Sequence, residues 1–191
     1  MRITGGRARG ILLKIPTRGS LRPATGYLRE AVFSSLGARV GGARVLDLFA
    51  GTGAYGLEAL SRGAAQATWV DANTAAVTAV RANLAAVAKA MGAAGPDALG
   101  RASEGDVFSW QPPTGAEFDL VFVDPPYALL PQFGAPLLAR AAAWLAPGME
   151  ARLLLEAPGE YDPIPPPGWV LARRLGKGKR QPSSLIFARS E

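Results

Sequence analysis

The sequence predicts an α/β fold built on a doubly wound, mostly parallel β-sheet. From Arg44 onward, short apolar runs alternate with stretches of helical periodicity, the pattern of parallel strands joined by crossover helices. A glycine-rich segment separates the first apolar run from its helix, and two β-prone runs close the chain as a hairpin. With 191 residues, 49% of them hydrophobic, the chain has enough apolar material for one domain with a small appendage.

The N-terminal segment is expected to form that appendage. Residues 2–16 contain two β-prone runs around a Gly/Arg turn, which predicts a small hairpin. Residues 21–37 predict a helix with Thr25 as its N-cap and with an apolar stripe that runs from Leu28 to Leu36. We therefore divide the chain into an extension, residues 1–40, and a main domain, residues 41–191.

The elements of the sheet follow at short intervals. Strands are expected at residues 44–50, 66–72, within 100–110, 118–126 and 151–158. Helices are expected between them at residues 55–63, 73–92 and 136–148. The closing hairpin, residues 169–190, should lie antiparallel at one edge of the sheet.

The composition excludes several kinds of chemistry. The chain has no cysteine, which rules out disulfides, thiolate nucleophiles and cysteine zinc sites. It also has no histidine, the commonest general base and metal ligand. Catalysis would therefore depend on carboxylates, hydroxyls, basic side chains, backbone groups or a cofactor. No apolar run is long enough to span a membrane and no signal peptide is visible, so we expect a cytoplasmic protein.

The net charge of +6 is concentrated at the two ends of the chain. Residues 1–30 carry seven basic side chains and one acidic one, and residues 173–191 carry six and one. Such an arrangement favours a polyanionic partner held by the ends, although basic termini can also simply be solvated. The candidate RNA-binding side chains are Arg2, Arg7, Arg9, Arg22, Lys177, Lys179 and Arg180.

The segment "DLFAGTGAYG" matches the pattern G-x-G-x-x-G between a strand and a helix, through Gly51, Gly53 and Gly56. Glycines let the backbone approach a ligand closely, and the helix N-terminus offers N–H groups. A dinucleotide is the usual ligand, but Asp47 lies where its pyrophosphate would rest. A carboxylate there suits a cationic ligand such as S-adenosylmethionine, with Asp71 on the ribose and Asp106 near the adenine amine.

The segment "VDPPY" follows the fourth strand and lacks two backbone donors. Pro125 and Pro126 have no N–H, so the Asp124 carboxylate and a proline carbonyl form a rigid pair of acceptors. Such a pair can hold both protons of an exocyclic amine and direct its lone pair at a methyl group, while Tyr127 stacks on the base.

These motifs carry a resemblance to a known family. "MRITGGRARG", "LRPATGYLREAVFSSL", "VLDLFAGTGAYGLEALSRGA" and "FVDPPY" together resemble RsmD-type 16S rRNA guanine-N2 methyltransferases over nearly the whole chain. The resemblance implies a Rossmann-like class I S-adenosylmethionine-dependent methyltransferase fold with a seven-stranded sheet, an antiparallel edge strand and a small N-terminal hairpin. It implies transfer of a methyl group to the 2-amino group of a guanine in the 30S subunit, with no metal.

The resemblance also assigns roles to residues of this chain. The target guanine would contact Asp124, Pro125, Pro126 and Tyr127. S-adenosylmethionine would contact Asp47, Phe49, Ala50, Gly51, Gly53, Gly56, Asp71, Ala72, Asp106 and Val107. The extension, residues 1–40, would contact RNA and cofactor, and we expect a monomer. Two features depart from the family pattern: an Asp at position 71, where Glu is frequent, and an Ala/Gly/Pro-rich loop at residues 92–103.

Three other functions compete with this one. An adenine-N6 or cytosine-N4 DNA methyltransferase would use the same acceptor pair, because the pair does not specify the base. An NAD-dependent oxidoreductase would use the same glycine loop, but Asp47 and the missing histidine and cysteine argue against it. A non-catalytic RNA-binding module would have no need of Asp124.

Overall fold

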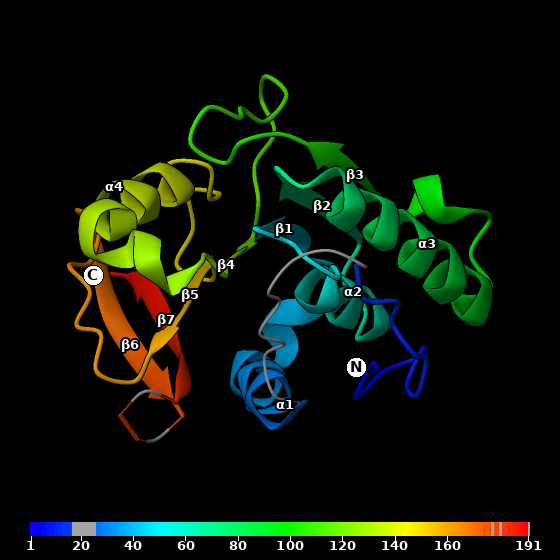
Figure 1. The fold of residues 1–191 in the computed structure, drawn as a ribbon, viewed down its shortest axis with the longest axis horizontal. Helices are drawn as coiled ribbons and strands as arrows, with labels where there is room; N and C mark the ends of the chain where they lie inside the picture. The colour runs from blue at the N-terminus through cyan, green and yellow to red at the C-terminus, as the bar shows by residue number, and fades with distance from the viewer. Residues whose placement is uncertain (17–25, 177, 180, 191) are drawn as a thin grey trace.

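The computed structural model describes residues 1–16, 26–176, 178–179 and 181–190. In this part of the chain, seven strands form one sheet in the order β3-β2-β1-β4-β5-β7-β6 (Figure 1). The strands are β1 (Arg44–Leu48), β2 (Gln66–Asp71), β3 (Gly100–Glu104), β4 (Leu120–Val123), β5 (Arg152–Pro158), β6 (Trp169–Leu175) and β7 (Pro182–Arg189). The α-helices are α1 (Gly26–Leu36), α2 (Ala54–Ser61), α3 (Thr74–Met91) and α4 (Leu130–Ala142), and 3₁₀ turns lie at Gly37–Val40, Pro96–Ala98 and Tyr127–Leu129.

The doubly wound sheet predicted from the sequence is confirmed. From β1 the sheet extends through β2 and β3 in one direction and through β4 and β5 in the other, and all of these strands are parallel. Strand β7 runs antiparallel to both β5 and β6, so the reversed strand of the closing hairpin lies next to the edge strand. The reversal of strand order between β1 and β4 opens a crevice at their carboxyl ends, where folds of this type bind ligands.

Alternate side chains of the central strands pack on opposite faces of the sheet. Phe122 and Leu154 belong to the layer under α1, α2 and α3, whereas Val121 and Leu155 belong to the layer under α4. Figure 1 shows α4 apart from α1 and α2, on the other side of the sheet. Because side chains alternate between the two faces of a strand, Phe122 and Leu154 point toward α1 and α2, and their neighbours in the chain point toward α4.

Helix boundaries follow the local sequence, with one correction. Helix α3 begins after Asn73, whose side chain accepts a 2.8 Å hydrogen bond from the N–H of Ala75, and ends at Gly92 in the left-handed conformation. The helix expected at residues 136–148 instead begins at Leu130. Its apolar face starts there, and Pro131 occupies the first turn, where a missing N–H costs little. The N-cap expected at Thr25 lies outside the described residues.

The N-terminal segment forms a minimal hairpin that joins the main domain. Arg2 and Leu12 make one antiparallel bridge, and the side chains of Ile3 and Leu13 are buried in the layer under α1, α2 and α3. The buried carboxylate of Glu58 on α2 accepts hydrogen bonds of 2.9 Å from the N–H groups of Thr4 and Gly5. The extension therefore shares its core with the sheet.

Candidate active site

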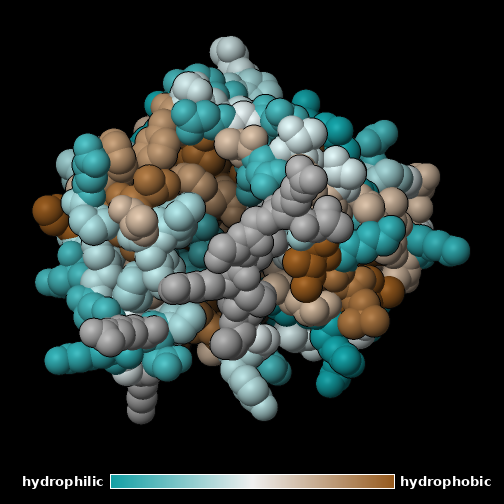
Figure 2. Space-filling model, in the orientation of Figure 1, coloured by the Kyte–Doolittle hydropathy of each residue, from teal (hydrophilic) through white to brown (hydrophobic). Residues whose placement is uncertain are grey.

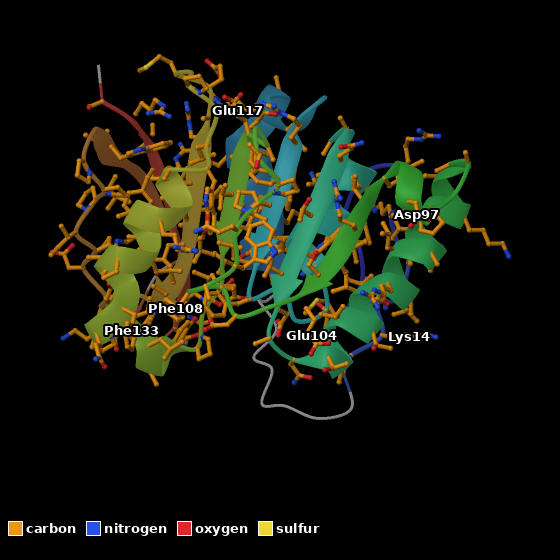
Figure 3. The ribbon with its side chains drawn as sticks, turned by 90° about the horizontal axis from the view of Figure 1, so that it is seen from above. Lys14, Asp97, Glu104, Phe108, Glu117 and Phe133 are labelled. Carbon is orange, nitrogen blue, oxygen red and sulfur yellow. The ribbon has the colours of Figure 1, made fainter. Side chains whose placement is uncertain are left out.

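Four carboxylates line one cavity at the carboxyl edge of the sheet. Asp71 ends β2, Asp47 lies near the end of β1, Asp124 follows β4, and Glu156 lies on β5. The cavity has a volume of about 520 Å³, and Met1, Ile15, Phe49 and Tyr55 are among its other lining residues. In Figure 3 this edge is marked by Glu104 and Phe108, whereas Asp97 and Glu117 lie toward the opposite edge. Such a concentration of carboxylates suits a ligand rich in cationic or donor groups.

The first part of the glycine loop lines the cavity, and its backbone conformation is unusual. Phe49, Gly51 and Gly53 all have positive φ angles, of 58°, 54° and 77°. A non-glycine residue in this region is strained, so the structure holds Phe49 at some energetic cost beside the cavity. Gly51 lines the cavity, and its N–H donates a 2.9 Å hydrogen bond to Oδ2 of Asp71.

The other two glycines of the motif pack against Trp69 on β2. A Cβ at Gly56 would lie 2.4 Å from Nε1 of Trp69, and a Cβ at Gly53 would lie 3.1 Å from the same atom. The indole N–H donates a 3.2 Å hydrogen bond to the carbonyl of Gly53. Neither glycine lines the cavity. Their role in this structure is to let α2 approach β2 closely, which positions the loop.

Asp47 lines the cavity and is buried, with 2% of its surface exposed. Its Oδ2 accepts a 2.9 Å hydrogen bond from the N–H of Gly56. Burial raises the pKa of Asp47 to about 7, helped by the nearby charge of Asp71 and opposed by the hydrogen bond from Gly56. A bound cation would favour the ionised form.

The residues predicted around a nucleoside divide into two groups. Ala50 and Asp71 line the cavity, and Oδ1 of Asp71 accepts a 2.8 Å hydrogen bond from the N–H of Asn73. Three others, Ala72, Asp106 and Val107, are not among the lining residues.

The segment around Asp106 is shaped by its own turn. Oδ1 of Asp106 accepts from the N–H of Phe108 at 3.0 Å, and the Val107 side chain is buried in the layer under α4. Phe108 packs between Phe49 and Phe133, at ring-centre distances of 6.2 and 5.2 Å. Figure 3 shows Phe108 and Phe133 side by side at the carboxyl edge. This aromatic group is a feature that the sequence analysis did not anticipate.

All four residues of the Asp-Pro-Pro-Tyr segment line the cavity. Asp124 is half-buried, its N–H donates to the carbonyl of Leu48 at 3.3 Å, and Tyr127 begins a 3₁₀ turn. Burial raises the pKa of Asp124 well above its usual value, and the charges of Glu156 and Asp47 add to this effect. The segment thus presents a rigid, acceptor-rich wall beside an aromatic ring.

Sequence reasoning missed Glu156 and Tyr55. Glu156 is buried on β5, and its Oε2 accepts a 2.8 Å hydrogen bond from the hydroxyl of Tyr55 on α2. Burial raises the pKa of Glu156 to about 7, whereas the hydrogen bond from Tyr55 and the charge of Arg29 oppose the shift. The available signal was an acid at the end of the apolar run "LLLEAP". Tyr55 lies between Gly53 and Gly56 of the glycine motif, at a position where the motif accepts any residue.

The N-terminal segment supplies part of the cavity wall through Met1 and Ile15. The buried side chain of Asn83 on α3 fixes this segment: its Oδ1 accepts from the N–H of Lys14 at 2.7 Å, and its Nδ2 donates to the carbonyls of Lys14 and Thr52 at 3.0 Å. Figure 2 shows hydrophobic side chains gathered where Figure 1 draws the N-terminal segment, and Ile15 is 54% exposed.

The predicted RNA-binding side chains differ in their surroundings. Arg2, Arg9 and Lys179 are exposed. The guanidinium of Arg7 donates to the backbone carbonyl of Met91, which holds it against the end of α3. Arg22, Lys177 and Arg180 lie outside the described residues.

Among the residues that the structure describes, every helix is too short or too polar to span a membrane. The same residues contain no group of three or more His, Cys, Asp or Glu side chains arranged to hold a metal ion.

Comparison with known proteins places this chain among methyltransferases. A family model described as "Conserved hypothetical protein 95" matches residues 1–179. Ribosomal RNA small subunit methyltransferase D of Escherichia coli K12 is 37% identical over 182 residues, 94% of this chain and 86% of that protein.

Two solved structures are similar over almost their whole length. Escherichia coli yhhF is 33% identical with a TM-score of 0.78, covering 99% of this chain and 97% of that one. Thermus thermophilus TTHA0928, titled a hypothetical protein, is 30% identical with a TM-score of 0.76, covering 100% and 99%. The structural likeness confirms the predicted class I methyltransferase fold.

Proposed function

The chain belongs to the family of ribosomal RNA small subunit methyltransferase D, and from this premise we propose that it methylates the 2-amino group of a guanine in 16S rRNA. The methyl donor would be S-adenosylmethionine, and the substrate the 30S subunit or an assembly intermediate in the cytoplasm. The observation that carries the proposal is one cavity containing both Asp47 beneath the glycine loop and the Asp-Pro-Pro-Tyr wall.

The donor end of the cavity fits a cationic nucleoside without phosphate. S-adenosylmethionine would supply an electrophilic methyl group on a sulfonium centre. The buried carboxylate of Asp47 would attract the positive charge of the methionine part, and Gly51 would let that part approach the backbone. Asp71 and the ring of Phe49 would lie beside the ribose and the base. The same carboxylates would repel the pyrophosphate of NAD, which disfavours an oxidoreductase.

The acceptor end of the cavity fits a planar base with an exocyclic amine. The Asp124 carboxylate and a carbonyl of the Pro-Pro segment would accept the two amine protons, and the ring of Tyr127 would stack on the base. Holding both protons directs the nitrogen lone pair toward the methyl group. As the N–C bond forms and the C–S bond breaks, the charge that develops on nitrogen lies beside Asp124, which can take the released proton.

The basic side chains of the extension would hold the rRNA backbone. Arg2 and Arg9 are exposed on the same segment that contributes Met1 to the cavity wall. Phosphate contacts of this kind make affinity fall with salt, and the target base has to leave its stack to reach Tyr127. A single protomer contains all the parts described.

The test is methyl transfer to methyl-deficient 30S particles and to 16S rRNA, with tritiated S-adenosylmethionine and mapping of the label to one nucleotide. We expect N2-methylguanine, loss of at least about 100-fold in rate for Asp124→Ala, and near-normal rate for Asp119→Asn. Asp119 is a fitting control because it precedes β4, pairs with Arg44 at 3.1 Å, and lies at the other end of the same strand. Label on adenine or cytosine, or a fully active Asp124→Ala protein, would refute the proposal.

A separate binding experiment distinguishes the competing classes. S-adenosylhomocysteine should bind with micromolar or tighter affinity in calorimetry, and NAD should not bind. Binding of NAD alone would indicate an oxidoreductase, and methylation of duplex DNA in preference to rRNA would indicate a DNA methyltransferase.

A further inference from the structure

Glu156 and Asp124 occupy matching positions on neighbouring strands. Val123 of β4 is registered with Leu155 of β5, and Asp124 and Glu156 are the next residues of each strand. Since Val123 and Leu155 both pack under α4, the side chains that follow them point to the opposite face, toward α2. Both carboxylates line the cavity, and the charge of Glu156 is among the causes that raise the pKa of Asp124, after its burial. Glu156 therefore lies beside Asp124, and the two carboxyl groups form one side of the cavity together.

The carboxylate of Glu156 is held in place from one side. Tyr55 donates to Oε2 at 2.8 Å, and the Tyr55 ring is itself stacked on Phe122, at a ring-centre distance of 4.9 Å and an angle of 17°. Within the described residues no donor bonds to Oε1. Burying a carboxylate oxygen that accepts no hydrogen bond costs free energy. A ligand in the cavity that donates a hydrogen bond to Oε1 of Glu156 would remove this cost.

The bases with exocyclic amines differ in the atom next to the amine. In guanine, the 2-amino group is adjacent to N1–H, so the edge presents donors only at these two positions. In adenine and cytosine, the atom next to the amine on the pairing edge is an unprotonated ring nitrogen, an acceptor. Two neighbouring carboxylates match the guanine edge, and a carboxylate facing an acceptor nitrogen would leave both groups unpaired.

We propose that Glu156 accepts a hydrogen bond from N1–H of the target base while Asp124 engages the adjacent amine, and that this pair of carboxylates selects guanine. The inference rests on the proposed function and adds to it the residue that distinguishes guanine from adenine and cytosine. It also assigns Tyr55 as a positioning residue, because its hydroxyl donates to the Glu156 carboxylate and orients it.

The decisive substrate is 2-aminopurine, which keeps the 2-amino group but has an unprotonated N1. The methylated nucleotide is first mapped, and 16S rRNA is then assembled by ligation with guanine or 2-aminopurine at that position and reconstituted into particles. Wild-type enzyme should prefer guanine by about 100-fold in kcat/KM, because a site built around a donor rejects an analogue that lacks it. In Glu156→Gln the amide offers both a donor and an acceptor, so the preference should shrink to within about 5-fold.

The control variant is Glu117→Gln, the same chemical change at the opposite edge of the sheet, where Glu117 pairs with Arg44 at 3.7 Å (Figure 3). It should keep the wild-type preference for guanine. An unchanged preference in a folded Glu156→Gln protein overturns the inference while leaving the proposed function intact. Failure of the wild type to methylate guanine N2 at all refutes the proposed function instead.

A second measurement needs no variant and so does not depend on the folding of Glu156→Gln. Reconstituted particles carrying inosine at the mapped position retain N1–H without the amine, and particles carrying unsubstituted purine lack both. Wild-type enzyme with S-adenosylhomocysteine should bind the inosine particles about 10-fold more tightly in a competition assay. Equal affinities would overturn the inference.

Discussion

The buried carboxylate of Asp47 accepts a 2.9 Å hydrogen bond from the backbone N–H of Gly56. This contact joins the first strand to the helix that follows the glycine loop, and it anchors an acid where burial opposes its charge. A buried acid with a raised pKa is typical of a ligand-binding or catalytic site. We propose that Asp47 binds the positively charged part of the methyl donor.

Asp47→Asn is expected to stabilise the ligand-free protein and weaken binding of the donor. Asparagine can still accept from Gly56 but carries no charge to bury, so the free energy of unfolding at pH 8 should rise by about 1–3 kcal/mol. Affinity for S-adenosylmethionine should fall by at least about 10-fold, since a charge-assisted contact is lost. Urea unfolding and calorimetry measure the two effects. Asp97→Asn, at an exposed position toward the opposite edge, should change neither; a destabilised Asp47→Asn protein with normal affinity would contradict the expectation.

The same carboxyl groups predict how stability depends on pH. The pKa of both Asp47 and Glu156 is raised to about 7 in the folded protein by burial, so each group binds its proton more tightly when folded than when unfolded. Their stabilising contribution is complete below about pH 4, near the unfolded pKa values, and is lost as pH rises through about 7. Glu58 and Asp119, whose pKa values are lowered, act in the opposite direction but only in more acidic solution.

The free energy of unfolding of the ligand-free protein should therefore fall between pH 5 and pH 8. Urea titrations at four pH values in this range measure it, and the slope should decrease in Asp47→Asn. Stability that rises across the range would show that these carboxyls are ionised without penalty in the folded protein.

Gly56→Ala is expected to damage the fold through Trp69. The added Cβ would lie 2.4 Å from Nε1 and 2.6 Å from Cε2 of a fully buried indole, so α2 or Trp69 has to move. We expect a loss of about 2–4 kcal/mol in the free energy of unfolding, typical of overpacking in a core. Gly148→Ala is the matched control: nothing lies within 4 Å of its Cβ position, and stability should change by less than about 0.5 kcal/mol. Equal effects of the two variants would contradict this packing role.

Glu58→Gln should loosen the attachment of the N-terminal extension. The buried carboxylate of Glu58 accepts from Arg29 at 3.2 Å and from Arg62 at 2.8 Å, and also from the backbone of Thr4. Removing its charge leaves the buried guanidinium of Arg29 without its ionic partner. We therefore expect the free energy of unfolding, measured with a chemical denaturant, to fall by about 3–5 kcal/mol.

The control makes the same chemical change in an exposed ion pair. Glu150 is 77% exposed and pairs with Arg39 at 2.7 Å, so Glu150→Gln should cost less than about 1 kcal/mol. Similar losses in both variants would show that burial does not matter for the Glu58 pair. Hydrogen exchange at Thr4 and Gly5 should accelerate in Glu58→Gln if the extension is released.

The fold and much of the cavity could be predicted because their signals are local. The alternation of strands and helices and the strand–loop–helix context of Gly51 are both visible within short windows of sequence. So is the placement of acids after successive strands: the sequence predicts Asp47, Asp71 and Asp106 around the methyl donor, and separately Asp124 at the target base. The structure brings Asp47, Asp71 and Asp124 to one cavity, whereas Asp106 is not among its lining residues.

The remaining features depend on contacts between distant residues. Tyr55 and Glu156 are 101 positions apart, and no spacing rule connects them. Gly56 matches a ligand-binding pattern, but its packing partner Trp69 lies on the next strand. Asp106 follows the third strand as expected, yet its side chain turns back to cap its own loop. Sequence periodicity identifies strands and helices but does not determine such pairings.

Tyr127 offers a test of how the target base is held. The ring lines the cavity directly after the rigid Pro-Pro segment, so a base that enters between this wall and the donor would stack on it. Tyr127→Ala should lower kcat/KM for methylation of 30S particles by about 10- to 100-fold, the value of one base–aromatic stack. Tyr127→Phe keeps the ring and should retain activity within about 3-fold of wild type. If the phenylalanine variant is as impaired as the alanine variant, the hydroxyl rather than the ring carries the function, and stacking is not what holds the base.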